Sequence, residues 1–300
     1  MKNLTLTLAI LSLLYLVPTN ASADALEGKK TAGEIIAGAT DADWRILDQE
    51  NLLYIKLARG TVIVELSSAL AQNHVAQIRA LARENFYDGL SFYRVIDGFV
   101  AQGGDVFEKR NVETAQTSLT AEFEEALEAK ERFTQLDVVD GYADSVGFIA
   151  GLAAGVDHKA NHAWHLHCTG ALAMARNAAR DTGSTEFYIT LQPQRYLDRN
   201  LTVFGRVVEG MEYLQALRRV EPAQSEDDDL GETILTIRVG SDLPEEEQKQ
   251  LQMLRADTSL FADYVEARKN RASGFFYHRP DHVDICQLPI PVEPVDRETE

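Results

Sequence analysis

Residues 86–105 place a charged side chain inside an apolar, strand-forming stretch, FYDGLSFYRVIDGFVAQGGD. If the run around Arg94 is a strand, Phe92 and Arg94 point to the same face, because side chains alternate along a strand. A guanidinium stays charged at any physiological pH and needs an acceptor when it lies against an apolar wall. Two interpretations follow: Arg94 forms a buried ion pair with an acid, or it donates hydrogen bonds into a pocket lined by Phe99, close to Gln102.

A second group of reactive side chains, His158, His162, His165, His167 and Cys168, could ligate a metal. Their spacing matches no zinc template. The group leads directly into an apolar run, which favours an insertion loop followed by a strand over a metal site. We therefore expect no metal here.

The acidic residues offer weaker candidates. The run 226–229 could bind calcium, but it lacks the spacing of an EF-hand loop, so a solvated loop is favoured. Asp198 could pair with a base, although a chain-turning role is favoured, and Asp105 after two glycines is expected in a turn. These groups predict no cofactor.

Several short strands must position these side chains. Residues 52–57 and 61–66 are β-rich and separated by Ala-Arg-Gly, a hairpin signal. Ser67 or Ser68 is expected to cap a following helix that ends near Asn85. Further elements are expected at 91–96, 99–102, 171–175, 186–191, 202–208 and 233–239 (strands) and at 210–219 (a second helix). This pattern predicts a mainly β protein, a closed antiparallel barrel with helical caps.

Composition sets limits on the protein class. The chain has 300 residues, of which 45% are hydrophobic, enough for a substantial core and too many for wholesale disorder. Its net charge of −18 disfavours non-specific binding to nucleic acid or to an anionic membrane. Its two cysteines, Cys168 and Cys286, form either one disulfide or two buried thiols.

The N-terminal residues resemble a secretory signal. Lys2 precedes an apolar run of residues 4–17, and Ala-Ser-Ala at 21–23 is typical of a cleavage site. We expect a signal peptide over 1–23, no membrane span after its removal, and a periplasmic or secreted protein. A retained N-terminal anchor is the alternative. Residues 24–50 are expected to form a partly ordered arm.

The C-terminal residues 241–300 differ from the middle of the chain. Pro244 followed by three glutamates predicts a helix start, and Leu251, Leu254, Phe261 and Val265 recur at near-helical spacing. Four prolines at 280–294 then exclude regular helix or central strand. A helix followed by an extended tail is therefore expected.

The 86–105 stretch resembles the signature of the cyclophilins, the peptidyl-prolyl cis-trans isomerases. Two later blocks agree in order: GALAMAR at 170–176 with STEFYIT at 184–190, and YLD at 196–198 with VFGRVVEGM at 203–211. The resemblance implies an eight-stranded antiparallel barrel closed by two helices over 51–240. It is interrupted by an insertion at about 126–165, with a helix expected near 127–133 and a flexible glycine-containing segment after it.

The resemblance also implies roles for single residues. Arg94 matches the catalytic arginine, Phe99 and Val100 match the floor of the proline pocket, and Gln102 matches the glutamine that holds the peptide. Val100 replaces the methionine that many members have. The remaining substrate-binding positions are Ala175 and Arg176 on the backbone stretch that pairs with the substrate, and Tyr188, Tyr196, Leu197 and Leu201 around the pocket. Tyr188 replaces phenylalanine, so its hydroxyl needs a partner or water.

The implied activity is isomerisation of X-Pro bonds in proline-containing polypeptides, without a metal, nucleotide or other cofactor. The insertion and the tail are expected to restrict or select protein clients. One alternative, favoured by the altered pocket residues, is a non-catalytic module or chaperone that binds proline segments on the same barrel. Another is a metal-dependent enzyme built on the histidines.

Overall fold

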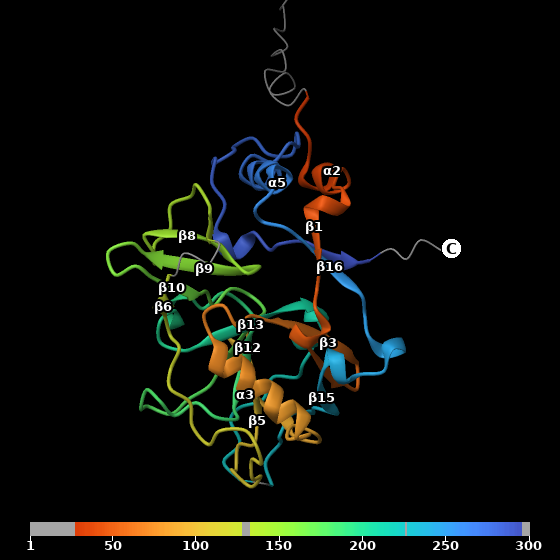
Figure 1. Ribbon diagram of the computed structural model, residues 1–300, viewed down its shortest axis with the longest axis vertical. Coiled ribbons are helices and arrows are strands. Elements are labelled where there is room, and N and C mark those ends of the chain that lie inside the picture. Colours follow the sequence, from red (N-terminus) through yellow and green to blue (C-terminus); the bar gives the residue numbers. More distant parts are fainter. Residues whose placement is uncertain (1–27, 128–132, 226, 296–300) are drawn as a thin grey trace, which may run out of the picture.

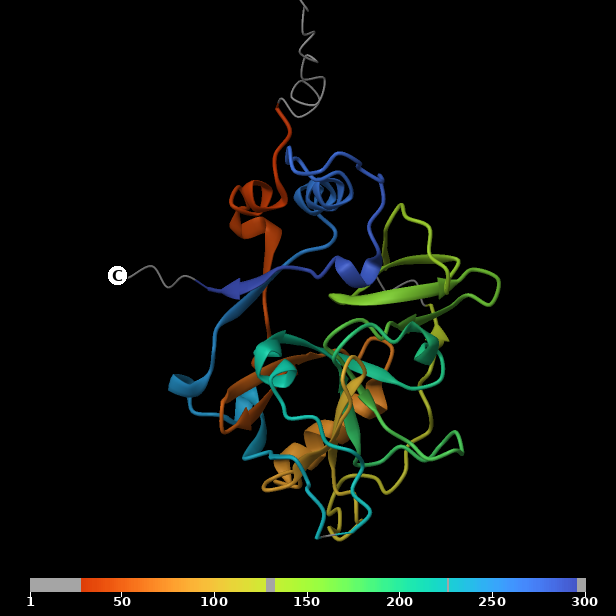
Figure 2. The ribbon, with the colours of Figure 1, turned by 180° about the vertical axis from the view of Figure 1, so that it is seen from behind.

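The computed structural model describes residues 28–127, 133–225 and 227–295. Three antiparallel sheets share the molecule (Figure 1). The largest sheet lies at one end, a pair of helices lies at the other, and two smaller sheets lie between them; Figure 2 shows the same arrangement from behind. No helix in these three ranges is long and apolar enough to cross a bilayer.

The largest sheet follows the strand pattern expected from the sequence. Its order is β14-β4-β5-β12-β11-β13-β3-β2-β15. The bounds are β2 Leu52–Leu57, β3 Gly60–Leu66, β4 Ser91–Val95, β5 Val100–Gly104, β11 Ala171–Met174, β12 Phe187–Thr190, β13 Val203–Glu209, β14 Glu232–Thr233 and β15 Thr236–Val239. The mainly β class and the β2–β3 hairpin are confirmed.

The sheet is curled, and its strand count differs from the expected eight. Its edge strands β14 and β15 belong to one short run of chain, broken at Ile234 and Leu235. The N–H of Ile234 donates to Leu90 O (2.7 Å) beside β4, and the N–H of Leu235 donates to Lys56 O (2.8 Å) in β2. The last predicted strand is therefore split between two partners, which gives nine strands instead of eight.

Two helices accompany this sheet, as expected. α3 (Gln72–Arg83) buries the apolar residues Val75, Ile78, Leu81 and Ala82, but its N-cap is Ala71 and not Ser67 or Ser68. Ser67 instead continues the sheet, since its N–H donates to Phe204 O (2.9 Å). α4 (Met211–Gln215) is shorter than predicted and follows Gly210, whose φ is +83°. A Cβ at Gly210 would lie 2.5 Å from Thr61 O, so the close approach of α4 to β3 requires glycine.

The insertion forms a sheet, and the expected flexible segment is wrong. Its order is β6-β10-β9-β8-β7, with bounds β6 Glu125–Ala126, β7 Phe133–Gln135, β8 Ser145–Ile149, β9 Leu152–Asp157 and β10 His162–His165. A Cβ at Gly147 would lie 2.0 Å from Thr134 O, and one at Gly155 would lie 2.8 Å from the Trp164 ring. These glycines therefore permit close strand packing and do not confer flexibility. Of the helix expected near 127–133, residues 128–132 lie outside the described ranges, and Phe133 is in a strand.

Strands from the N-terminal and C-terminal regions form a three-stranded sheet, ordered β1-β16-β17 (Trp44–Ile46, Leu251–Leu254 and Val292–Pro294). The helix expected from Pro244 through Leu251 and Leu254 is wrong. Only a 3-10 turn, η5 (Glu245–Glu247), follows Pro244, because the two leucines are buried in β16 between β1 and β17. The helix α5 begins later, at Ser259–Lys269, where the Thr258 hydroxyl accepts from the Phe261 N–H (3.2 Å).

The terminal segments are fastened to the rest of the protein. α2 (Ala32–Ile36) packs beside α5. Of the two states left open for the cysteines, the structure has the disulfide, which joins Cys168 next to β11 to Cys286 in the tail. One apolar cluster contains Ile63 of the large sheet, Trp164 of the insertion, and Leu251 and Phe261 of the C-terminal region. The remaining short 3-10 turns are η1 Asp41–Asp43, η2 Gln49–Asn51, η3 Arg195–Leu197, η4 Gly240–Asp242 and η6 Ile285–Gln287.

Candidate active site

Arg94 and Gln102 face each other on adjacent strands. They are register partners in β4 and β5, and Arg94 Nη1 donates to Gln102 Oε1 over 3.0 Å. Gln102 Nε2 in turn donates to the Tyr93 hydroxyl over 2.5 Å. The Arg94 guanidinium carbon lies 5.3 Å from the centre of the Phe99 ring. Within the three described ranges no carboxylate pairs with Arg94, so the geometry favours a donor held beside a ring over a buried ion pair.

The expected alternation of side chains along β4 is interrupted. The pairing of β4 with β5 shifts register between Ser91 and Arg94. Phe92 is fully buried in the core of the large sheet, whereas Tyr93 and Arg94 both reach Gln102. Arg94 therefore does not share the apolar surroundings of Phe92, and the irregularity brings two neighbouring side chains to the same glutamine.

Beside Arg94 lies an apolar cluster that contains most of the predicted pocket residues. Val100 and Tyr188 are buried in it, and four partly buried residues pack against it: Phe99, Ala175, Leu197 and Leu201. They come from β5, β12, η3 and the ends of β11 and β13. The sequence reasoning did not name the other buried members, Ala171, Ala173 and Val203. Their small side chains on adjoining strands were the available signal.

The Tyr188 hydroxyl has the partner that its burial requires. It lies 2.8 Å from His167 Nε2, and His167 Nδ1 lies 3.0 Å from Asp198 Oδ1. A carboxylate can only accept, so Nδ1 donates to Asp198, and Nε2 is the atom that meets the Tyr188 hydroxyl. Burial raises the pKa of Tyr188 well above its ordinary value, which keeps the hydroxyl protonated. Both ring nitrogens of His167 are thus engaged within the protein.

The structure contradicts the favoured expectation that Asp198 only turns the chain. Its Oδ2 accepts from Arg195 Nε over 2.6 Å, so it pairs with a base. Arg195 Nη1 and Nη2 donate to the two oxygens of Asp140 over 2.8 and 2.9 Å. Burial opposes the charge of Arg195, but the hydrogen bonds to the two aspartates prevail and raise its pKa.

This ion-pair network joins the insertion to the pocket wall. Asp140 belongs to the loop between β7 and β8, and the side chains of Arg195 and Asp140 are only 8% and 6% exposed. The Arg195 guanidinium also lies 5.0 Å from the centre of the Tyr142 ring. Because Leu197 follows Arg195 in the same 3-10 turn, the network holds the insertion against one edge of the apolar cluster.

Two predicted substrate-binding residues lie outside the cluster. Tyr196 is 60% exposed at its edge. The side chain of Arg176 donates to Asn200 O (2.9 Å) and lies over the Phe123 ring (5.2 Å), so it braces a loop. The predicted role of Arg176 is to pair its backbone with the substrate, and the direction of its side chain does not test that role.

Comparison with known proteins decides the family. The family model described as "Cyclophilin type peptidyl-prolyl cis-trans isomerase/CLD" matches residues 52–239, more than half of the chain. The chain belongs to the cyclophilin family. Its enzyme class is therefore peptidyl-prolyl cis-trans isomerase, EC 5.2.1.8.

Individual cyclophilins resemble the chain over different lengths. A "Probable peptidyl-prolyl cis-trans isomerase" of Brucella suis is 30% identical over 178 residues, 59% of this chain and 76% of that protein. "Peptidyl-prolyl cis-trans isomerase B" of Bacillus subtilis is 34% identical over 161 residues, 53% of this chain and 85% of that protein. The crystal structure of cyclophilin AquaCyp293 from Hirschia baltica superposes with a TM-score of 0.69 at 26% identity. It covers 89% of this chain and 98% of its own, so the likeness extends beyond the family-model match.

This cyclophilin has a cavity of about 210 Å³ that is lined by three of the predicted site residues, Gln102, Ala175 and Arg176. Its lining includes Tyr93, Asp105, Glu108 and Glu186. Burial, assisted by the neighbouring acids, raises the pKa of Glu186 to about 7. The cavity therefore places a carboxyl group that titrates near neutrality beside the Arg94–Gln102 pair.

The histidines do not assemble a metal site in the described ranges. His158 Nε2 contacts Ser145 Oγ (2.9 Å), and His162 Nδ1 lies 3.5 Å from Glu124. His165 is buried, and burial lowers its pKa to about 4. No group of three or more His, Cys, Asp or Glu in these ranges could hold a metal, and the fifth candidate, Cys168, is in the disulfide.

Two residues of the acidic run at 226–229, Asp228 and Asp229, contact neighbouring residues of the same loop region. Asp228 accepts from the backbone N–H groups of Gln224 and Ser225, and Asp229 pairs with Arg218. Residue 226 lies outside the described ranges. These contacts account for the two aspartates as loop-forming residues.

Proposed function

We propose that this cyclophilin accelerates X-Pro isomerisation during the folding of exported proteins, and that Arg94 stabilises the twisted amide. The observation that carries this proposal is the position of the Arg94 guanidinium, which contacts Gln102 and Phe99 beside an apolar cluster. No carboxylate in the described part of the chain pairs with it. A charged donor that is not neutralised in the free enzyme is available to a substrate.

The chemistry needs a donor of this kind. Rotation about a peptide bond is opposed by about 18–20 kcal/mol, because nitrogen shares its lone pair with the carbonyl. In the twisted transition state the lone pair is localised on nitrogen and can accept a hydrogen bond. A hydrogen bond from Arg94 to that nitrogen would form in the transition state and not in the planar ground state, and such a difference lowers the barrier.

The apolar cluster supplies the second requirement, which is to hold the proline ring while the other side of the bond turns. Phe99, Val100, Tyr188 and Leu197 offer apolar surface for the ring. Gln102, fixed between Arg94 and Tyr93, would position the substrate backbone. The partner class is therefore a polypeptide that contains proline.

The required acceleration is within reach of such a site. Uncatalysed isomerisation takes about 10–100 s, so a turnover of roughly 10³ per second is a gain of four to five decades. This corresponds to roughly 5.5–7 kcal/mol of transition-state stabilisation. A charged hydrogen bond in a water-poor site, together with fixation of the ring, is of this size.

Export is the second part of the proposal. The signal-like residues 1–23 lie outside the described ranges and support it by their composition alone. The disulfide between Cys168 and Cys286 supports an oxidising compartment, such as the periplasm or the extracellular medium. The insertion, fastened beside Leu197 through Asp140, is where we propose that clients are selected.

The decisive experiment compares wild type with Arg94→Ala and Arg94→Lys in a protease-coupled assay on a short X-Pro peptide. We expect Arg94→Ala to lower kcat/KM by at least about 100-fold at an unchanged Tm. Arg59→Gln, at an exposed arginine paired with Glu232, is the matched control and should keep full activity. If Arg94→Ala retains more than half of the wild-type rate, the role of Arg94 is wrong. If the wild type binds the peptide without turnover, the non-catalytic binding module replaces the enzyme.

A further inference from the structure

The last two residues of α5 and the segment that follows them concentrate positive charge and aromatic rings on an otherwise acidic protein. Residues 268–282 read RKNRASGFFYHRPDH, with four Lys or Arg against a single Asp, whereas the whole chain carries −18. We call residues 268–282 the cationic segment. Figure 1 places it beside α5, at the end of the molecule away from α3 and β5. The charge of the chain is therefore distributed unevenly, with a positive region at one end.

The arginines of the cationic segment are held close together. Arg279 donates from Nε to Arg271 O (3.1 Å) and from Nη2 to Ser273 O (3.0 Å). The Arg271 guanidinium lies 5.6 Å from the centre of the Phe276 ring. Together with Arg268, these residues line a cavity of about 340 Å³. The fold of the segment therefore holds like charges closer together than an extended chain would.

These charges are not neutralised by the neighbouring acids. In the described part of the chain, no carboxylate pairs with Arg268, Arg271 or Arg279. Lys269 differs, because it lies 3.7 Å from Glu266 and 3.4 Å from Asp281. Arg271 is exposed. Arg268 and Arg279 are partly exposed and donate to backbone carbonyls, which leaves their positive charge uncompensated, although Asp284 lines the same cavity.

Exposed aromatic rings accompany the arginines. Phe275 is 80% exposed and Tyr277 is 95% exposed, more than any other aromatic residue among the exposed large apolar ones. Phe275 meets Phe276 edge to face at 5.2 Å, so the rings and the charges belong to one surface. Moving such rings out of water is energetically favourable. Aromatic rings next to Lys or Arg are typical of contacts at a membrane interface.

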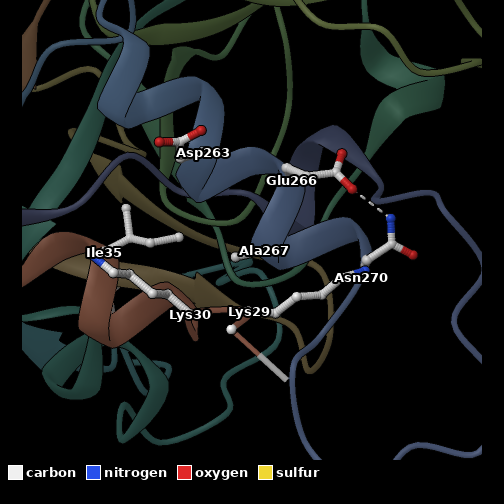
Figure 3. Close-up of a pocket in the computed structure, with 8 residues that line it drawn as sticks. Lys29, Lys30, Ile35, Asp263, Glu266, Ala267 and Asn270 are labelled. Atoms are coloured by element: carbon white, nitrogen blue, oxygen red, sulfur yellow. Dashed lines mark hydrogen bonds between the residues drawn. The ribbon is translucent and has the colours of Figure 1, made fainter. Parts of the chain in front are cut away.

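A second cavity beside α5 shows where the N-terminal segment lies. Figure 3 shows Lys30 and Ile35 on one side of it and Asp263 and Glu266 of α5 on the other, with Lys29 near Asn270, which follows α5. Its lining carries both signs of charge, so it does not indicate an anionic ligand by itself. It does place two more lysines at the same end of the molecule as the cationic segment.

We propose that the cationic segment docks the protein on the surface of an anionic lipid bilayer. Arg271 would contact headgroup phosphates, the charges of the partly exposed Arg268 and Arg279 would add to the attraction, and Phe275 and Tyr277 would enter the interface between headgroups and acyl chains. A soluble phosphate would use the same arginines but would leave both rings in water, so the exposed rings favour the bilayer. The net charge does not prevent docking, because charges farther than about 8 Å from the surface are screened at physiological salt.

Docking of this kind would leave the catalytic groove free. The site around Arg94 and Gln102 is built on β4, β5 and β12 of the large sheet, and Figure 1 shows that sheet at the opposite end from α5. The docking surface is therefore independent of the isomerase site, and the two can be tested separately.

The experiment is co-sedimentation of the mature protein with vesicles of phosphatidylcholine alone or mixed equally with phosphatidylglycerol. We expect binding to the mixed vesicles only, weakening as salt is added. Arg271→Gln should lower the partition coefficient about fivefold, the contribution of one basic residue near an anionic surface. Phe275→Ser with Tyr277→Ser should lower it by a further roughly tenfold.

Matched controls separate this surface from general charge and hydrophobicity. Arg59→Gln and Val139→Ser change an exposed arginine and an exposed apolar residue outside the cationic segment and should bind like wild type. All variants should retain peptide isomerase activity, so loss of vesicle binding is distinguishable from failure of the proposed function. No binding to mixed vesicles at low salt, equal binding to neutral vesicles, or equal loss in the controls would each overturn the proposal. Release by inorganic phosphate at an ionic strength where chloride does not release the protein would show a phosphate site instead, and would also overturn it.

Discussion

The ion pair between Arg195 and Asp140 offers the sharpest test of how the insertion acts on the site. Asp140→Ala removes both acceptors of the Arg195 Nη atoms and leaves only Asp198 on Nε. Breaking one partner of a buried pair costs about 3–5 kcal/mol, because the remaining charge stays buried without compensation. Since Asp198 remains, we expect the lower value, about 3 kcal/mol.

This cost can be measured as a change in Tm. For a domain of about 150–250 residues, 1 kcal/mol shifts Tm by about 2–4 °C, so Asp140→Ala should lower it by about 6–12 °C. The assay is thermal unfolding followed by circular dichroism under oxidising conditions. Asp137→Asn, at an exposed aspartate three positions earlier, is the matched control and should leave Tm unchanged.

The same variant has a functional consequence. Arg195 begins the 3-10 turn that carries Leu197, so its release should loosen one wall of the pocket. Below the unfolding transition we expect KM to rise about two- to fivefold, with a smaller change in kcat, because Arg94 is untouched. The rise should be larger for proline-limited refolding of a protein than for a short peptide. A Tm equal to that of Asp137→Asn would refute the energetic reasoning, and equal KM changes for both substrates would refute client selection by the insertion.

Three further predictions concern other groups. Tyr188→Phe leaves the buried His167 Nε2 without its partner and should lower the free energy of unfolding by about 1–3 kcal/mol in denaturant titration, while the retained ring preserves most of the activity. A stability equal to wild type would contradict the assigned hydrogen bond. The pKa of Glu186 is raised from 4.5 to about 7 by burial, so its stabilising contribution is complete below about pH 4.5 and is lost as the pH rises through 7. As the pH rises from about 4.5 to 7, Glu186→Gln should therefore become more stable relative to wild type, and a difference that does not vary with pH would show that Glu186 titrates normally. Cys286→Ser opens the disulfide to Cys168, which spans 118 residues, and should cost about 2–5 kcal/mol. Dithiothreitol should destabilise the wild type by a similar amount and leave this variant unaffected, and equal effects on both would count against the disulfide.

Local patterns were sufficient for the large sheet. The strands at 52–57, 61–66 and 91–96 follow from short runs of strand-favouring residues, and the helix ending near Asn85 follows from helical spacing. The same patterns failed for Leu251 and Leu254. Their spacing of three residues suits a helix, yet both leucines are buried in β16. Only the pairing with β1, some two hundred residues earlier in the chain, selects the strand.

For the site, the sequence by itself determined which residue types are present, and family resemblance indicated Arg94, Phe99, Val100 and Gln102. The tertiary structure alone decided what those residues contact. It showed that, among the residues the structure describes, Gln102 and not a carboxylate holds Arg94. No local pattern reveals the chain of contacts from Tyr188 through His167 and Asp198 to Arg195 and Asp140, because its members are distant in sequence and meet only when the insertion packs beside the pocket. Side-chain periodicity reports which face of an element is buried, whereas a buried polar network depends on which elements meet, and long-range packing sets that.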